Sequence, residues 1–374
     1  MHKNILLIFV LLLFSCKKDP VPSPPEDGST NCATIHIRKD SDNSFYEINT
    51  PYQDIENNKY QWKFTNFQNA NIDSSIFSSG INSIKNHSTL LSVLLIRNDK
   101  IVYEQYFHSG SKDLSTNIHS ASKSIISALI GIAIEKNKIA GVDQKLVDFF
   151  PDYISNNAWK KEIRIKDLLT MTAGLKWKEN YTEYSIEKTG NWLKSILKLP
   201  MADSPSTVFH YSTANTHILS AVLQEATEIN NCEFLYTNLM SDLGIVVEHW
   251  GRDPQGYYSG GYNFYITPRE LAQFGLLYLN HGKLDSIQII PSNWVDACLT
   301  EHVKADATYD YGYCWWITTI SGHKVYKAWG YGGQYICLIP DFDIELVSTA
   351  NTNGEYNQLD IDEFIKDYVI PAVK

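Results

Sequence analysis

The segment 118–124, I-H-S-A-S-K-S, places a serine and a lysine at a spacing that suits nucleophilic catalysis. Ser120 and Lys123 are three positions apart, so on a helix their side chains share one face and the lysine can reach the serine hydroxyl. A free serine is a poor nucleophile and needs an adjacent base. Lysine serves as that base when burial or a neighbouring cation lowers its pKa enough to make it neutral. The expected chemistry is attack of Ser120 on a carbonyl, with Lys123 as the base.

The S-x-x-K spacing alone does not identify the nucleophile, because the chain contains five more copies. These copies begin at Ser15, Ser109, Ser185, Ser195 and Ser321. A random copy usually lies on a solvated surface. Only the copy at Ser120 opens a long apolar run, residues 125–134, which predicts a buried helix over residues 122–136. The N-terminus of that helix adds positive potential where an oxyanion would form.

Strand-like runs near both ends of the chain must help to position these residues. Residues 91–96 and 101–107 are β-rich and are joined by R-N-D-K, which predicts a hairpin. Residues 335–340 and 344–350 predict two further strands. Between them, residues 140–245 carry helical patterns with Pro and Gly breaks, and residues 268–279 and 362–369 predict two more helices. We therefore expect one sheet assembled from distant parts of the chain, with a helical lobe formed by its middle.

In this context the chain resembles the serine β-lactamase-like hydrolases, which include class C β-lactamases, DD-carboxypeptidases, related esterases and 6-aminohexanoate-dimer hydrolases. The resemblance covers about residues 75 to 370, and its pieces stand in family order. After the hairpin and the S-x-x-K segment come I-K-D-L-L-T-M-T-A-G-L (165–175), F-H-Y-S-T-A-N (209–215), T-P-R-E-L-A-Q-F-G (267–275) and G-Y-G-G-Q (330–334). The resemblance implies an α/β (α+β) fold of the β-lactamase/DD-peptidase type. In that fold an antiparallel sheet flanked by helices packs beside an all-helical lobe, here at about 140–250, and the active site lies between them.

The resemblance also implies roles for single residues. Ser120 matches the nucleophile, Lys123 its base, and Tyr211 the tyrosine that delivers a proton to the leaving group. The backbone N–H groups of Ser120 and Tyr331 match the oxyanion hole. The family often reads Tyr-x-Asn, but Thr213 stands where that Asn would be. Asn215 lies two positions later, as in the esterase and aminohexanoate-dimer hydrolase relatives, and is the candidate substrate contact. This departure weakens an assignment as a β-lactamase.

The third family motif, Lys-Thr-Gly or His-x-Gly on a sheet-edge strand, has two candidate positions. Lys188-Thr189-Gly190 spells it literally, but this tripeptide precedes Tyr211 in a helical-looking stretch and is interpreted as an accident. The counterpart in family order is Ala328-Trp329-Gly330-Tyr331. Ala328 replaces the cationic or imidazole residue, so a substrate carboxylate loses one partner. Trp329 and Gly330 are the candidate substrate-binding residues there, and Trp329 would offer apolar area.

The N-terminus predicts export. Lys3 precedes a ten-residue apolar run, 5–14, which is too short to span a bilayer and is typical of a secretory signal. The ending L-F-S-C resembles a bacterial lipobox, so we expect residues 1–15 to be a lipoprotein signal peptide and Cys16 to be acylated. The alternative is a signal peptide with an accidental Cys. Residues 16–31, rich in Pro and Ser, predict a disordered tether, and residues 32–374 form the hydrolase domain.

Composition excludes several classes of function. A formal net charge of −10 argues against a nucleic-acid partner, which needs a basic face. The remaining cysteines are widely spaced and the histidines are scattered, so neither a metal site nor a cofactor is expected. One pair of cysteines could form a disulfide in an exported protein, but the sequence does not choose the pair.

Together these features predict a serine hydrolase that acts through an acyl-enzyme on a small-molecule ester or amide, such as one derived from the cell wall. The protein would lie in the bacterial cell envelope, held at a membrane by its N-terminal lipid and facing the periplasm or the cell surface. The alternative from a different class is a non-catalytic or weakly catalytic lipoprotein on the same fold that binds penicillin or senses the cell wall.

Overall fold

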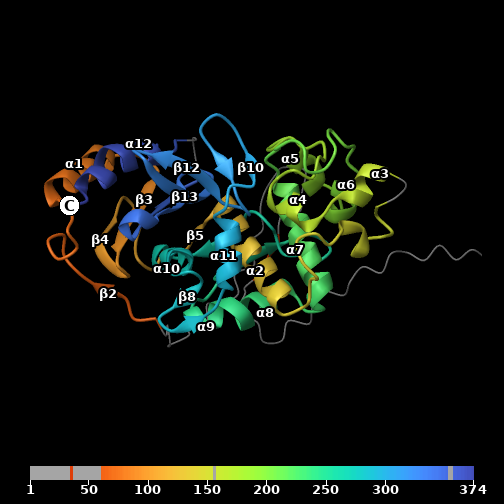
Figure 1. Cartoon of the computed structure of the whole chain (residues 1–374), viewed down its shortest axis with the longest axis horizontal. Helices are drawn as coiled ribbons and strands as arrows, with labels where there is room; N and C mark the ends of the chain where they lie inside the picture. The colour runs from red at the N-terminus through yellow and green to blue at the C-terminus, as the bar shows by residue number, and fades with distance from the viewer. Residues whose placement is uncertain (1–33, 37–59, 155–156, 353–356) are drawn as a thin grey trace, which may run out of the picture.

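The computed structural model describes residues 34–36, 60–154, 157–352 and 357–374 of the chain. The expected signal peptide, the acylated Cys16 and the tether at 16–31 lie outside these residues. The described part consists of a sheet lobe and a helical lobe side by side (Figure 1). Within the described part, no helix has the length and apolar character needed to cross a membrane.

A nine-stranded sheet forms the centre of the first lobe. Its strand order is β10 (Val303–Lys304), β11 (Asp310–Tyr311), β12 (Trp316–Ile320), β13 (His323–Gly330), β14 (Gln334–Ile339), β15 (Ile344–Ala350), β3 (Leu90–Arg97), β4 (Lys100–Tyr106) and β2 (Lys63–Phe64). Neighbours pair antiparallel, except that β2 runs parallel to β4. The expected hairpin is confirmed as β3 and β4. Because β15 pairs with β3, the sheet joins distant parts of the chain, as expected.

Both faces of the sheet are covered by helices, which explains why β3 is apolar at most of its positions, with Ser92 as a buried, hydrogen-bonded exception. Along β3, Val93 and Leu95 point to one side and join the core beneath α1 (Ser74–Ile84) and the C-terminal helix α12 (Ile361–Phe364). Leu94 and Ile96 point to the other side and join the core of α2 (Ser122–Glu135) and α10 (Pro268–Leu279). Alternate side chains of a strand face opposite sides, so a sheet buried on both sides needs apolar residues at most positions. The predicted fold class, a sheet flanked by helices, is confirmed.

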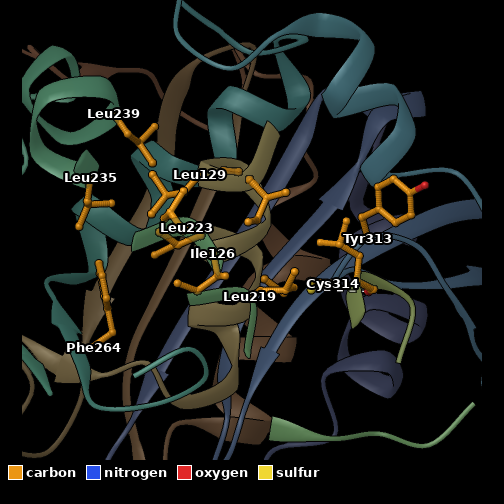
Figure 2. Packing of buried hydrophobic residues seen from close by; sticks show 14 of the residues in the cluster. Ile126, Leu129, Leu219, Leu223, Leu235, Leu239, Phe264, Tyr313 and Cys314 are labelled. Carbon is orange, nitrogen blue, oxygen red and sulfur yellow. Dashed lines mark hydrogen bonds between the residues drawn. The ribbon is translucent and has the colours of Figure 1, made fainter. Parts of the chain in front are cut away.

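The second lobe is built from helices between the two sheet-forming ends of the chain. They are α3 (Ala158–Glu162), α4 (Ile165–Leu169), α5 (Thr182–Glu187), α6 (Trp192–Lys198), α7 (Thr213–Thr227), α8 (Asn231–Leu235) and α9 (Ser241–Leu243), with a π-helical turn at Tyr236–Met240. This lobe packs on α2, whose residues 122–133 are all buried. Figure 2 shows Ile126 and Leu129 of α2 against Leu219 and Leu223 of α7. A helix that is buried all round is held by packing on every side, so α2 fixes its first turn rigidly.

A second, smaller sheet, which the sequence did not predict, contacts the turn that contains Ser120. It contains β1 (Thr34–His36), β6 (His249–Arg252), β7 (Phe264–Ile266) and β5 (Thr116–Asn117), in that order. In β5, the Asn117 side-chain oxygen accepts hydrogen bonds from the backbone N–H groups of His119 and Asn263, both at 2.9 Å. The smaller sheet is therefore tied directly to the residue before Ser120.

The cysteines of the described chain divide into two kinds. Cys232, on α8, is in a disulfide. Cys298, Cys314 and Cys337 are free and buried.

Candidate active site

Ser120 lies in a short 3-10 turn, His119–Ala121, which leads directly into α2. His119 adopts φ of 46°, a left-handed conformation that is uncommon for a non-glycine residue, and its backbone N–H is held by Asn117. The turn directs Ser120 into a cleft with a volume of about 1260 Å³. The cleft is lined by residues of both lobes, as the family resemblance implied.

Lys123 lies in the first turn of α2 and is 1% exposed. Its Nζ is 2.9 Å from Ser120 Oγ, 3.0 Å from Thr213 Oγ1 and 3.3 Å from the carbonyl oxygen of Gly261. Burial lowers the pKa of Lys123, against the opposing effect of nearby carboxylates, which favours the neutral amine. The backbone at Gly261 comes so close that an added Cβ would lie 2.6 Å from Nζ. The spacing of Ser120 and Lys123 therefore brings the serine hydroxyl and the lysine amine within hydrogen-bond distance.

Tyr211 lies two residues before α7 and next to Ser120. It shares a hydrogen bond with Ser120, its ring centroid is 5.2 Å from Lys123 Nζ, and it stacks on Trp316 at 5.4 Å. Burial, followed by the charge of Glu179, raises the pKa of Tyr211 above its ordinary value. The tyrosine is therefore a neutral phenol that can donate a proton.

Thr213 and Glu179 are a pair that the sequence did not predict. Thr213 is the first residue of α7, and both its backbone N–H, at 3.1 Å, and its hydroxyl donate to the carboxylate of Glu179. Glu179 comes from the loop before α5 and also accepts from the indole N–H of Trp177. The residue at the family's Asn position thus links Lys123 to a carboxylate. The departure Thr213 was a visible signal, but its partner lies 34 positions away in a loop.

Two further carboxylates, Glu183 and Glu187, line the same cleft from α5. Burial and the neighbouring charge of Glu179 raise the pKa of Glu183 to about 7. The hydroxyl of Tyr262 donates to Glu187 at 2.7 Å. Among the described residues that line the cleft there is no lysine or arginine. Glu183 and Glu187 are four positions apart on α5, a spacing that could have drawn attention to this face of the helix.

The opposite wall comes from the end of β13, where two of the predicted residues reach the cleft. Trp329 and Tyr331 line it. Gly330 does not face the substrate space, because it packs against the turn before Ser120: an added Cβ would lie 2.1 Å from the carbonyl oxygen of Ile118. This close approach brings the backbone of Tyr331 next to the nucleophile turn.

The expectations for Asn215 and for position 328 need correction. Asn215 is 2% exposed and its side-chain amide points to the sulfur of Met171, because it lies on the face of α7 that packs into the helical lobe. Ala328 is 1% exposed in the core, so this position does not open onto the cleft. The neighbouring Lys327 lies on the other face of β13 and is paired with Asp362 at 2.6 Å.

The literal Lys188-Thr189-Gly190 follows α5 in a turn of the helical lobe, and Lys188 and Gly190 are exposed. Its interpretation as an accident is consistent with this position, far in the fold from the sheet edge. Among the residues that the structure describes, no group of three or more His, Cys, Asp or Glu side chains could hold a metal ion.

Comparison with known proteins agrees with this geometry. The family model described as Beta-lactamase matches residues 86–367. The chain belongs to the beta-lactamase family. A 6-aminohexanoate-dimer hydrolase from Paenarthrobacter ureafaciens is 22% identical over 290 residues, which cover 69% of this chain and 71% of that protein.

Solved structures of the beta-lactamase family share the fold at low sequence identity. The octameric penicillin-binding protein homologue from Pyrococcus abyssi superposes with a TM-score of 0.63 at 16% identity, covering 79% of this chain and 76% of that chain. A class C beta lactamase from Rhodobacter sphaeroides superposes with a TM-score of 0.62 at 15% identity, covering 80% of this chain and 100% of that chain. These likenesses show that the chain shares its fold with these structures.

Proposed function

We propose that the protein is a serine hydrolase that cleaves an ester or amide through an acyl-enzyme. The observation that carries this proposal is the position of Ser120 Oγ, which lies 2.9 Å from the buried Lys123 amine and is hydrogen-bonded to Tyr211. A nucleophile, a base and a proton donor thus converge at one point of a cleft.

In this mechanism each group has one task. Lys123, whose pKa is lowered by burial, accepts the proton of Ser120 as the serine oxygen attacks the substrate carbonyl. Tyr211 donates a proton to the leaving group, and water then releases the acyl group. The backbone N–H groups of Ser120 and Tyr331 would hold the oxyanion, supported by the close packing of Gly330 on Ile118. The loss of one such donor typically costs about 3 kcal/mol of transition-state stabilisation.

We further propose that the acyl or leaving group carries no carboxylate. No lysine or arginine is among the described residues that line the cleft, and Lys327 is paired with Asp362 on the other face of β13. Glu179, Glu183 and Glu187 line the cleft instead, and like charges repel in a partly desolvated site. Trp329 and Tyr331 supply apolar area for a neutral group. These features favour a simple ester or amide over a penicillin or a peptide that ends in a free carboxylate.

The test is intact-mass measurement after exposure to a fluorophosphonate and, separately, to a penicillin. We expect the wild type to gain one fluorophosphonate adduct and the Ser120→Ala variant to gain none. Unchanged thermal unfolding of the variant would show that the loss is chemical. Full labelling of Ser120→Ala would show that another residue is the nucleophile. A stable penicillin adduct without ester turnover would instead indicate a penicillin-binding protein.

Export and lipid anchoring through Cys16 remain part of this proposal. They are supported by the apolar run and the L-F-S-C ending of the N-terminus. The disulfide of Cys232 is also consistent with an oxidising compartment.

A further inference from the structure

The hydroxyl of Thr213 joins the Lys123 amine to the carboxylate of Glu179. Lys123 Nζ is 3.0 Å from Thr213 Oγ1, and that hydroxyl donates to Glu179 Oε1. With the 2.9 Å contact between Lys123 and Ser120, these bonds form an unbroken chain of exchangeable protons. We propose that Glu179, acting through Thr213, receives the proton that leaves Ser120 during acyl transfer. This inference rests on the proposed function and assigns two positioning residues to it.

The direction of proton transfer along these hydrogen bonds follows from which groups can donate. A carboxylate only accepts, so the single hydroxyl proton of Thr213 is committed to Glu179 and its oxygen must accept from Lys123. The carbonyl of Gly261, 3.3 Å from Nζ, also only accepts and takes a second N–H. A neutral amine has two N–H bonds and one lone pair, so its lone pair is left facing the hydroxyl of Ser120.

Ser120 is set up in the same way from its other side. Tyr211 shares a hydrogen bond with Ser120, and Lys123 Nζ is 2.9 Å from the same serine oxygen. When the phenol is the donor in the first of these bonds, the single proton of the serine is left for Lys123. In this arrangement the hydroxyl of Ser120, one N–H bond of Lys123 and the hydroxyl of Thr213 point along the chain toward Glu179, while the other N–H bond of Lys123 is held by Gly261. Proton transfer can run along the chain without any side chain first rotating.

The proton balance of the step is complete within these four residues. As Ser120 Oγ bonds to the carbonyl carbon, its O–H bond breaks and an N–H bond forms on Lys123. A different N–H bond of Lys123 breaks as Thr213 gains a proton, and the original hydroxyl proton of Thr213 passes to Glu179. Lys123 and Thr213 end neutral, Glu179 becomes a carboxylic acid, and the negative charge moves to the substrate oxyanion. When the leaving group departs, it takes the phenol proton of Tyr211. The reverse transfer through Thr213 and Lys123 then replaces the proton on Tyr211, so Glu179 is again a carboxylate and no proton accumulates.

A purely structural role for Glu179 is the competing explanation, because it also caps α7. Its carboxylate accepts the backbone N–H of Thr213 at 3.1 Å, a favourable contact at a helix N-terminus. Several charged or titratable groups interact electrostatically with Glu179 or lie next to a group that does. They are Lys123, Glu183, Glu187, Tyr211, Tyr262 and Tyr311. The test must therefore separate the cap from the proton chain and Glu179 from Glu183.

Thr213→Val makes that separation, because valine matches the shape of threonine and keeps the capped N–H but has no hydroxyl. We expect kcat for a p-nitrophenyl ester to fall about 10²-fold, as for loss of a positioned proton-transfer group, with little change in KM and in thermal unfolding. Thr213→Ser restores the hydroxyl and should recover most of kcat. Glu179→Gln keeps an accepting oxygen for the cap but takes up no proton, so its kcat should fall as far as that of Thr213→Val.

A proton inventory and a matched control variant complete the test. A proton inventory in mixtures of H₂O and D₂O should be curved in the wild type and in Glu183→Gln, because several protons move together. It should be straight in Thr213→Val and Glu179→Gln. Glu225→Gln is the matched control, since Glu225 lies on α7 outside the cleft and accepts from Tyr257 at 2.6 Å, and it should behave as the wild type.

The outcomes are distinguishable from a failure of the proposed function. Near-normal kcat with a curved proton inventory in Thr213→Val would overturn the relay while leaving Ser120 as the nucleophile. A fall in thermal stability of Glu179→Gln with normal kcat would assign Glu179 to the cap alone. If the wild type gains no adduct at Ser120, the proposed function itself fails before the relay is tested.

Discussion

At the scale of single residues, Glu183 makes the charge of the cleft depend on pH near neutrality. Burial and the charge of Glu179 raise its pKa to about 7. As pH rises through that value, Glu183 ionises and adds a negative charge to a cleft already lined by Glu179 and Glu187. The cleft should therefore become less tolerant of anionic substrates with increasing pH.

This dependence predicts how substrates are ranked. Neutral p-nitrophenyl esters should exceed nitrocefin, which carries a carboxylate, in kcat/KM. The ratio should rise roughly fivefold between pH 6 and pH 8, since a like charge roughly 10 Å away costs about 1 kcal/mol at intermediate dielectric and physiological salt. In Glu183→Gln that rise should be absent, whereas Glu225→Gln should retain it. Nitrocefin turnover that equals ester turnover at pH 8 would rule out this view of the cleft.

The contact between Ser120 and Lys123 was predictable from sequence, and the surroundings of these two residues were not. Ser120 and Lys123 share a helix face, so local geometry was enough to pair them. Glu179 contacts Thr213 across 34 positions, from a loop with no periodic pattern to place it. Asn215 was wrongly expected to line the cleft. Because α7 begins at Thr213, Asn215 lies in its first turn and is buried there.

At the scale of elements, the packing of α10 on β15 contains a buried acid. Glu345 of β15 is 0% exposed, and neither of its carboxylate oxygens has a hydrogen-bond partner within the described part of the chain. It fits only because α10 has a glycine opposite: a Cβ on Gly275 would lie 1.8 Å from Glu345 Oε1. Burial, with a smaller effect of Asp99, raises the pKa of Glu345 well above its ordinary value.

This acid predicts a pH-dependent loss of stability. Below the unfolded pKa of about 4.3 the carboxyl is protonated in both states; above it the unfolded chain ionises first, so the free energy of unfolding falls by up to about 1.4 kcal/mol per pH unit toward the raised folded pKa. Glu345→Met should therefore be more stable than the wild type, by about 1–3 kcal/mol at pH 5 from relief of the unpaired polar group, and by a larger margin at pH 8. Chemical denaturation at both pH values measures this. A margin that shrinks toward pH 8 would contradict a buried neutral acid.

Elements with strong end signals or long patterns were predicted best. The helix expected at 268–279 is α10 with the same bounds, because Thr267 and Glu270 form a capping box and Pro268 takes the first turn. The strand expected at 344–350 is β15. The smaller sheet escaped prediction, because strands such as β5 and β7 have two and three residues, too few for a pattern to stand out.

At the scale of the whole molecule, the N-terminus predicts where the hydrolase domain is held. Cys16→Ser should leave the protein uncleaved by a lipoprotein peptidase or release it from membranes, because anchoring by two or more acyl chains, at about 0.8 kcal/mol per buried CH₂, depends on that thiol. Fractionation and intact mass of the N-terminal peptide measure both. A soluble wild type with an unmodified Cys16 would rule out the anchor, and Ser120→Ala is the matched control that should stay on the membrane.

The pairing of β15 with β3 has a consequence for when activity can begin. Translation delivers Ser120 and Lys123 early, but β3 lacks its partner β15 (Ile344–Ala350), and the cleft lacks the wall at Trp329 and Tyr331, until the C-terminal strands have been made. Contacts between such distant segments form late and slowly during folding. A growing chain on the ribosome therefore carries its nucleophile without a cleft to work in. The order of the segments delays hydrolysis until synthesis is nearly complete.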